Sequence, residues 1–486
     1  MTACLSLMYT GFMRNILFTL LCLWSIPLAA GETSDPFNTE AMLPPRPALH
    51  PDDAAGNPCS TPPANRALSL REVINLALCN NPQTREAWAN SRIQAALVGV
   101  SKAGYLPSVN LGASIERNRT GGSPATDQRS IGLSLSYLLY DFGSREANLE
   151  NSRQLFFAAS ATQNSVMQTV FLEAVQIYYQ AQAALAGLDA ALESERAAKE
   201  SFAAAEARYL AGSATPADKL QARTAYSQAT LNRITANGNL KNSQGALANM
   251  VGLDANRTVL LDSAGATVIP DDFEGDIGAL IEEARRLRPD LLAVAAQLRA
   301  AKASADAARA AGGPSISLNA SSSQNSSAGI SSNTNRVGVT LSMPLFTGYA
   351  TTYRIRAAEA QIDARNTQLE RLRLQVALDV WVAYQNLITT TQSLRSTADL
   401  LDSAEQSERV ALGRYKAGVG SMLDVLNAQS ALASARQQRI QSTFNWNIDR
   451  AMLAQAMGNL DSGLLQHLQD AEKKQPRENQ LQKKPS

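Results

Sequence analysis

Few residues in this chain have the types and spacings that support catalysis. Its two histidines, His50 and His467, lie near opposite ends of the 486 residues, outside any HExxH motif or Cys/His cluster. That placement argues against a histidine-based zinc site and a Ser-His-Asp triad. No Gly-Lys dipeptide occurs, so the Walker A phosphate loop is absent. We therefore expect a protein that is not an enzyme and needs no metal or cofactor.

Two aspartates recur in the same local context and are the best candidates for a functional site. Thr215-Pro-Ala-Asp218 and Ser421-Met-Leu-Asp424 each place an acid three residues after a hydroxyl residue. This is the spacing of a capping box at a helix start, and Pro216 suits the first helical position. The simplest interpretation is that each aspartate caps a helix. A cation-binding role would require several such carboxylates to meet.

The overall charge argues against a nucleic-acid partner. The chain has 44 Lys and Arg residues against 43 Asp and Glu residues, a net charge of +1. No basic excess is available to neutralise phosphates. Because 45% of the residues are hydrophobic and only 18% are charged, the chain is also unlike a disordered polyelectrolyte. We expect it to fold.

The N-terminus has the pattern of an export signal. Arg14 precedes an apolar run over residues 16–30, and small residues at its end suit cleavage. The run is too short to span a membrane as a helix. This pattern predicts a secretory signal peptide over residues 1–31 and a mature chain that begins near Glu32. Residues 1–12 precede a more natural signal start and are interpreted as a start-site artefact.

The cysteines fit an oxidising compartment. Cys4 and Cys22 belong to the signal, and Cys22 lies within the apolar run rather than at the cleavage point, so a lipid anchor is not expected. Cys59 and Cys79 remain in the mature chain. Two remaining cysteines in such a compartment usually pair, and the bridge would add roughly 3 kcal/mol of stability. Two unrelated thiols are the alternative.

The chain is an internal duplication, because one half overlays the other at an offset of about 206 residues. The matches occur in the same order in both halves: Gly104–Leu111 with Ala311–Leu318, Leu139–Gly143 with Leu345–Gly348, Arg208–Gly212 with Arg414–Gly418, Asp218 with Asp424, and Gly252 with Gly458. We interpret residues 69–253 and 277–460 as two structural repeats joined by a linker over 254–276. A Pro-rich segment over 32–68 precedes them, and residues 461–486 form a C-terminal segment with a disordered tail.

Each repeat changes its hydrophobic period in the same order. A helical pattern at 69–102 is followed by period-two alternation, which predicts β-hairpins at about 108–139 and 315–345. Long helical patterns follow at 145–211 and 351–417, and each precedes another helix of about 35 residues. Apolar residues recur every seven positions in the long helices, the spacing of a coiled coil: Phe171, Tyr178, Leu185 and Leu192, then Val380, Leu387, Leu394 and Leu401.

The hairpins point to a membrane protein rather than a soluble coiled-coil scaffold. Each strand is about ten residues long, enough to cross a bilayer when tilted. Two isolated hairpins cannot bury an apolar face, and four strands are too few to close a barrel. Several chains would close it, with lipid covering the apolar face. A periplasmic scaffold explains the helices but not the hairpins.

The repeated motifs resemble those of the TolC family of outer-membrane export channels over nearly the whole mature chain. The motifs that carry the resemblance are Leu70–Pro82, Gly104–Ser108, Pro344–Gly348 and Arg414–Asn427. The resemblance implies a mixed α/β homotrimer in which four strands per chain form one 12-stranded transmembrane β-barrel. A long periplasmic coiled-coil barrel continues it. Pro107 and Pro344 fit the strand–helix junctions of that fold.

The resemblance also implies a function and partners. The sequence is most similar to the type I secretion branch, which includes exporters of adenylate cyclase-haemolysin. Such a channel would lie in the outer membrane and conduct its substrate passively from a periplasmic adaptor and an inner-membrane ABC transporter. The duct of a tripartite drug efflux pump, served by a proton-driven pump, is the main alternative. Many of those ducts are lipoproteins, and this chain lacks the required cysteine.

The family places an aperture at the periplasmic ends of the long helices. Asp218 and Asp424 match its constriction, where a threefold axis would gather up to six carboxylates into a cation-selective ring. This chain departs from one relative at two positions, with Gly420 where that relative has a bonding arginine and Asn427 where it has a second acid. Other residues must therefore close the aperture. The candidates are Arg208, Arg414 and Tyr415.

Overall fold

The computed structural model describes residues 35–43, 67–119, 121–122, 125–257, 259–262, 276–327 and 330–460. The chain divides into two units, residues 1–42 and 43–486. The described part of the first unit contains one short 3-10 helix, η1 (Glu40–Met42). The expected signal peptide, Cys59 and the C-terminal tail lie outside the described residues. Among the described helices, none combines the length and hydropathy that crossing a membrane requires.

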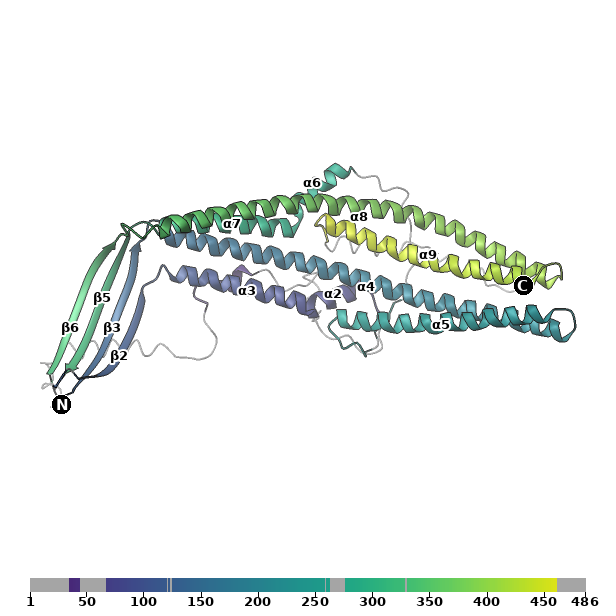
Figure 1. Ribbon diagram of the computed structural model, residues 1–486, viewed down its shortest axis with the longest axis horizontal. Helices are drawn as coiled ribbons and strands as arrows, with labels where there is room; N and C mark the ends of the chain where they lie inside the picture. The colour runs from purple at the N-terminus through teal and green to yellow at the C-terminus, as the bar shows by residue number, and fades with distance from the viewer. Residues whose placement is uncertain are drawn as a thin grey trace, which may run out of the picture. The chain divides into compact units, whose positions relative to one another are not determined.

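The second unit contains the same series of elements twice (Figure 1). The first series is α2 (Leu70–Asn80), α3 (Pro82–Ala103), β2 (Ser108–Asn118), β3 (Thr126–Tyr140), α4 (Ser144–Leu210) and α5 (Pro216–Met250). The second is α6 (Ile277–Leu287), α7 (Pro289–Ala310), β5 (Ser315–Ser327), β6 (Ile330–Ser342), α8 (Ala350–Lys416) and α9 (Met422–Ala456). Corresponding helices have equal lengths of 11, 22, 67 and 35 residues. The internal duplication is therefore present in the fold.

The helix expected over 69–102 is two helices, because a proline interrupts it. Asn81 has extended backbone dihedrals, ends α2 and caps α3, and its side chain accepts a hydrogen bond from the Gln83 amide at 2.9 Å. Pro82 then occupies the first position of α3, where a missing N–H costs nothing. Arg288 and Pro289 repeat this break between α6 and α7. The short strand β1 (Ala67–Leu68) precedes the first repeat, and β4 (Leu260–Leu261) follows it. The two strands pair in parallel.

The four long strands form one antiparallel sheet in the order β2-β3-β5-β6. Its centre joins the two repeats, because β3 of the first pairs with β5 of the second. β2 and β6 are its edges, each paired on one side only among the described residues. Pro107 immediately precedes β2, and Pro344 follows β6 by two residues. Left-handed backbone at Gly143 and Tyr349 then starts α4 and α8.

The long helices pack side by side in two sets. Near the strands α3 packs on α4, α4 on α7 and α7 on α8; further along, α5 and α9 pack on α4, and α8 packs on α9. The main core forms where α2 meets α4 and α5, and it includes Val73, Ile74, Phe171, Val175 and Leu247. The helices thus form a wall one layer thick whose edges are α3 and α8 near the strands, and α5 and α8 further on.

The seven-residue seam is buried over only part of its predicted length. Val380, Leu387 and Leu394 are buried on α8. On α4, Phe171 and Tyr178 are buried, but Leu192 is 46% exposed. A straight helix drifts about 20° per heptad relative to a 3.5-residue repeat, so the seam rotates off this face. Small residues take over the buried side of α4: Ala198, Ser201 and Ala205.

Candidate functional site

The two helical hairpins end in matching turns. α4 ends at Leu210 and α5 begins at Pro216, while α8 ends at Lys416 and α9 begins at Met422. In the first turn, the Gly212 amide donates to the Tyr209 carbonyl at 3.0 Å and the Ser213 amide to the Arg208 carbonyl at 2.9 Å. The second turn repeats both bonds. This is the Schellman arrangement, in which a glycine with positive φ ends the helix and satisfies its last carbonyls.

Both candidate aspartates form the capping boxes that their spacing predicts. Asp218 Oδ2 accepts hydrogen bonds from the Thr215 amide at 3.0 Å and the Thr215 hydroxyl at 2.8 Å. Asp424 Oδ2 accepts from the Ser421 amide at 3.2 Å, and the Asp424 amide donates to Ser421 Oγ at 3.1 Å. The cap thus engages one oxygen of each carboxylate, and it fixes each side chain at the tip of its hairpin.

The cap also keeps Asp424 ionised. Hydrogen bonds from the side chain and then the backbone of Ser421 lower the pKa of Asp424 below its usual value, and the positive charge of Arg414 adds a smaller effect in the same direction. Asp424 is exposed, so its charge faces water and any ion nearby. A carboxylate in this state is suited to attract cations.

Two of the three closing candidates meet between the hairpins. The Arg208 guanidinium lies over the Tyr415 ring, with its central carbon 4.3 Å from the ring centroid. Its Nη2 also donates to the Lys416 carbonyl at 3.1 Å. Arg208 belongs to the first hairpin and Tyr415 to the second, so this contact links the two tips. A cation over an aromatic face is a direct electrostatic attraction.

Tyr415 itself is a buried anchor. Its ring is 6% exposed and packs in a small apolar cluster with Ala205, Ala222, Met422 and Val425. Its hydroxyl is buried without a hydrogen-bond partner among the described residues. The ring, rather than the hydroxyl, therefore makes the contacts that hold the hairpins together here.

Arg414, the third candidate, lies elsewhere. It lines a groove of about 660 Å³ between α8 and α9 together with Gly420, Asp424 and Asn427. A Cβ at Gly420 would lie 3.0 Å from the Arg414 Cβ, so any side chain at this position requires its neighbours to shift by a few tenths of an ångström. The groove therefore has an arginine and an aspartate on its wall.

A second link between the hairpins was not evident from the sequence. Ser201 on α4 and Gln429 on α9 exchange hydrogen bonds of 3.0 and 3.4 Å between their side chains. Within the first hairpin, Lys219 pairs with Glu206 at 2.9 Å. Ser201 and Gln429 are 228 residues apart, and neither is unusual for a helix face, so no local signal pairs them.

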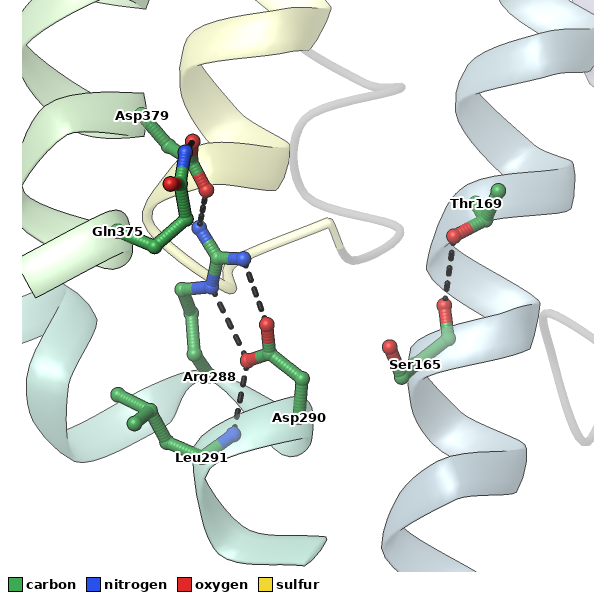
Figure 2. Close-up of polar contacts among 7 residues, drawn as sticks. All are labelled: Ser165, Thr169, Arg288, Asp290, Leu291, Gln375 and Asp379. Carbon is green, nitrogen blue, oxygen red and sulfur yellow. Dashed lines mark hydrogen bonds and ion pairs between the residues drawn. The ribbon is translucent and has the colours of Figure 1, made fainter. Parts of the chain in front are cut away.

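A separate ionic cluster holds α7 against α8, as Figure 2 shows. Arg288 contacts both oxygens of Asp290, at 3.1 and 2.6 Å, and one oxygen of Asp379 at 2.8 Å. Gln375 donates to the other Asp379 oxygen at 2.7 Å. Although burial alone lowers the pKa of Arg288, its two acid partners raise it above the usual value. Asp379 precedes the end of α8 at Lys416 by about 55 Å of helix, so this cluster lies away from the hairpin tips.

The remaining site predictions concern the cysteines and metals. Cys79 is disulfide-bonded, and its predicted partner Cys59 lies outside the described residues. Over the ranges that the structure describes, no three His, Cys, Asp or Glu side chains group closely enough to hold a metal ion.

Comparisons with known proteins agree with this architecture. The family described as "Outer membrane efflux protein" matches residues 73–253 and 280–459. Protein CyaE of Bordetella pertussis is 32% identical over 394 residues, which cover 79% of this chain and 82% of the relative. Outer membrane protein TolC of Vibrio cholerae is 24% identical and covers 81% and 91%.

A solved structure shows the same fold. CusC superposes with a TM-score of 0.72 over 82% of this chain and 95% of its own length, at 23% identity. The fold is therefore that of the TolC-type channel-tunnels, with a β domain and a long helical part, and the relatives are named outer-membrane proteins and channels. This places the protein in the outer membrane with its helices in the periplasm. The chain belongs to the outer membrane efflux protein family, whose members are channels, and within it to the TolC-like group.

Proposed function

We propose that this chain forms the outer-membrane channel of a type I secretion system, through which a protein toxin or another substrate passes without energy input from the channel. The similarity to CyaE and the absence of a Walker A motif support this proposal. The observation that best supports a channel is an open four-stranded sheet with an exposed apolar face. Such a sheet is stable only with further strands at its edges and lipid on that face.

The sheet's apolar face fits strands that cross a bilayer at an angle. Leu111 pairs with Leu133, but the same row continues into Ser322 and Asn335 on β5 and β6. The apolar residues of β6, Val337–Leu341, lie closer to the helices. The apolar band therefore runs obliquely across the four strands. This is what strands tilted by about 35–45° need in order to keep their apolar residues at one depth.

The free edges support a homotrimer. β2 and β6 can pair with the corresponding edges of neighbouring copies, and three copies then supply twelve strands. The edge helices carry matching apolar stripes at i, i+4 and i+7 spacing: Ile93, Leu97 and Val100 on α3, and Leu374, Leu378 and Trp381 on α8, all of them exposed. In a ring of copies, neighbouring chains would cover both stripes.

Within that trimer the tips would form the periplasmic aperture. Asp218 and Asp424 would contribute up to six carboxylates to one ring. In the closed state the contact of Arg208 with Tyr415 and Lys416 holds the two hairpins of each chain together, and the pair Ser201–Gln429 adds to it. Opening requires these contacts to break. Arg414 would act in the groove beside Asp424.

The partners follow from the same proposal. A periplasmic adaptor and an inner-membrane ABC transporter would bring the substrate and the energy to the channel. The alternative is the duct of a tripartite multidrug efflux pump with a proton-driven transporter, which the family description favours.

Deletion of the gene separates the two functions. If the channel serves type I secretion, a protein should disappear from the culture medium and accumulate in the cell, while drug susceptibility stays unchanged. The wild-type gene should restore its secretion. A normal set of secreted proteins together with increased drug susceptibility would instead establish the efflux function. In both cases the purified protein should give discrete conductance steps in a planar bilayer.

A further inference from the structure

An exposed aromatic strip begins where β6 gives way to α8. It consists of Phe346, Tyr349, Tyr353 and Arg356, and its three rings are 75%, 66% and 65% exposed. The Phe346 and Tyr349 rings meet edge to face with centroids 5.6 Å apart. The Arg356 guanidinium lies over the Tyr353 ring, 5.6 Å from its centroid. Tyr349, Tyr353 and Arg356 are spaced i, i+4 and i+7, which places them on one face of the helix.

The strip continues the apolar face of the sheet. Leu341, Met343 and Leu345, which lead into it from β6, are all exposed. Large apolar and aromatic side chains in a continuous exposed row need a covering other than water. Aromatic side chains collect where the hydrocarbon of a bilayer meets its headgroups, because their rings are apolar and their polar atoms remain hydrated.

If the strands cross the bilayer, Arg356 lies near the depth of the lipid headgroups. Its Cα is six residues into α8 from Ala350, about 9 Å along the helix axis. Side chains on a helix lean towards its N-terminus, which here is the end next to the strands. The headgroup layer is about 5–8 Å thick on each side of the bilayer, so the guanidinium can reach it.

The cation of the strip contacts a ring but no carboxylate among the described residues. Arg356 makes no ion pair among the described residues, and the nearest acid along the helix, Glu359, pairs with Arg309 at 3.0 Å. The matching junction of the first repeat differs. There, the Arg145 guanidinium donates hydrogen bonds to the Leu138 and Leu139 carbonyls at 2.7 and 3.2 Å. It also forms an ion pair with Asp141 at 3.3 Å.

We propose that the aromatic strip binds one anionic phospholipid of the periplasmic leaflet per chain. The acyl chains lie along Leu345 and Phe346, and the phosphate oxygens accept hydrogen bonds from the Arg356 guanidinium. Residues 350–358 contain no acid, so the face that carries Arg356 favours a headgroup with net negative charge over a zwitterionic one that adds an ammonium group. The proposal rests on the membrane orientation of the barrel given above.

Lipid titration of the purified full chain tests the site. Binding of phosphatidylglycerol and of phosphatidylethanolamine with the same acyl chains is followed by native mass spectrometry. Arg356→Gln should weaken phosphatidylglycerol binding about fivefold, the effect of one basic residue at an anionic surface. Arg354→Gln is the matched control, because Arg354 lies on the opposite side of the same helical turn and should bind the lipid like the wild type. Excess glycerol phosphate should not compete, since it lacks the acyl chains.

Three results would overturn the lipid site. Arg356→Gln could bind phosphatidylglycerol as the wild type does, or both arginine variants could lose binding equally, which would indicate general charge attraction. Alternatively, Arg356→Gln could reduce the assembled mass of the protein in detergent, which would indicate that a second copy covers the strip. Bilayer conductance of the wild-type protein tests the channel independently, so a conducting protein without lipid selectivity contradicts the lipid site alone.

Discussion

At the level of single residues, the aperture proposal depends on what the capped aspartates can still do. Their capping boxes satisfy the helix starts and hold each carboxylate in place. A capped carboxylate keeps its negative charge, so capping and cation binding are compatible roles. In a single chain the two roles cannot be told apart. In an assembled channel they differ, because only a ring of carboxylates affects the ions that pass.

Replacing both aspartates should change the ion preference of the channel. The double variant Asp218→Asn plus Asp424→Asn keeps amide groups of similar shape at the caps and removes up to six charges from the assembled ring. Cation selectivity should fall, and block by polyvalent cations from the periplasmic side should weaken about tenfold or more. Planar-bilayer recordings measure both. Trimers that form normally and keep their selectivity and block would show that both residues are only helix caps.

Arg208 should contribute to the closed state more than the Tyr415 hydroxyl does. Arg208→Ala removes a cation–ring contact and a hydrogen bond, together about 1–2 kcal/mol, so the ratio of open to closed channels should rise about tenfold. Tyr415→Phe keeps the ring and removes a hydroxyl that has no hydrogen-bond partner among the described residues, so it should leave the channel closed. Single-channel recordings compare these variants with Arg223→Ala, an exposed arginine of the same hairpin. Opening by Tyr415→Phe but not by Arg208→Ala would contradict the assignment.

At the level of elements, the break between α6 and α7 is stabilised by ion pairs that include a neighbouring helix. The first repeat breaks its helix at Asn81, whose short side chain caps the next helix. Arg288 occupies the corresponding position and makes no side-chain cap. It instead reaches Asp379 on α8 and Asp290 on its own helix (Figure 2). The duplicated elements thus keep the same break with different chemistry.

Loss of the ionic contacts of Arg288 with Asp290 and Asp379 should destabilise the packing of the helices. Arg288→Gln leaves Asp290 and Asp379 close together without their cation, and the free energy of unfolding should fall by about 1–3 kcal/mol. Arg309→Gln is the control: Arg309 also contacts two acids, but it is exposed, and exposed pairs contribute little. Thermal unfolding in detergent, followed by circular dichroism, compares the two variants. Equal effects would show that burial does not strengthen the Arg288 cluster.

At the level of the whole molecule, one chain presents surfaces that only an assembly can cover. Within the part of the chain that the structure describes, the sheet has two unpaired edges and an exposed apolar face, and the edge helices carry exposed apolar stripes. These features occur together along both edges of the same unit. A closed ring of copies covers all of the edges at once, whereas a single chain leaves two edges open.

A charge within the α8 stripe should prevent assembly. Leu378→Glu places a carboxylate in the middle of an exposed apolar stripe that a neighbouring copy would cover, where its desolvation would cost several kcal/mol. The variant should therefore be largely monomeric in detergent. Asn386→Glu, on an exposed polar face of the same helix, should assemble normally. Light scattering with size-exclusion chromatography measures the mass of each. Normal trimers of Leu378→Glu would place the interface elsewhere.

The sequence by itself determined the elements and their duplication. Period-two and helical patterns, proline and glycine positions and the capping spacings are local features, and each acts within a few residues of its own position. For this reason the spacing of Asp218 and Asp424 from their hydroxyl residues is enough to assign both to helix starts. The family motifs are likewise contiguous stretches of sequence, and the family match includes both repeats.

Only the tertiary structure decided which distant residues meet. The contact of Arg208 with Tyr415, the pair Ser201–Gln429 and the pairing of β3 with β5 join residues about 175–230 positions apart, and sequence spacing contains no distance information at that range. The tertiary structure was also needed to show that the seven-residue seam of α4 turns away from the buried face along the helix. This happens because a helix with 3.6 residues per turn rotates slowly relative to a seven-residue repeat. Local chemistry fixes each element, whereas the contacts that link the two tips depend on how the helices pack in three dimensions.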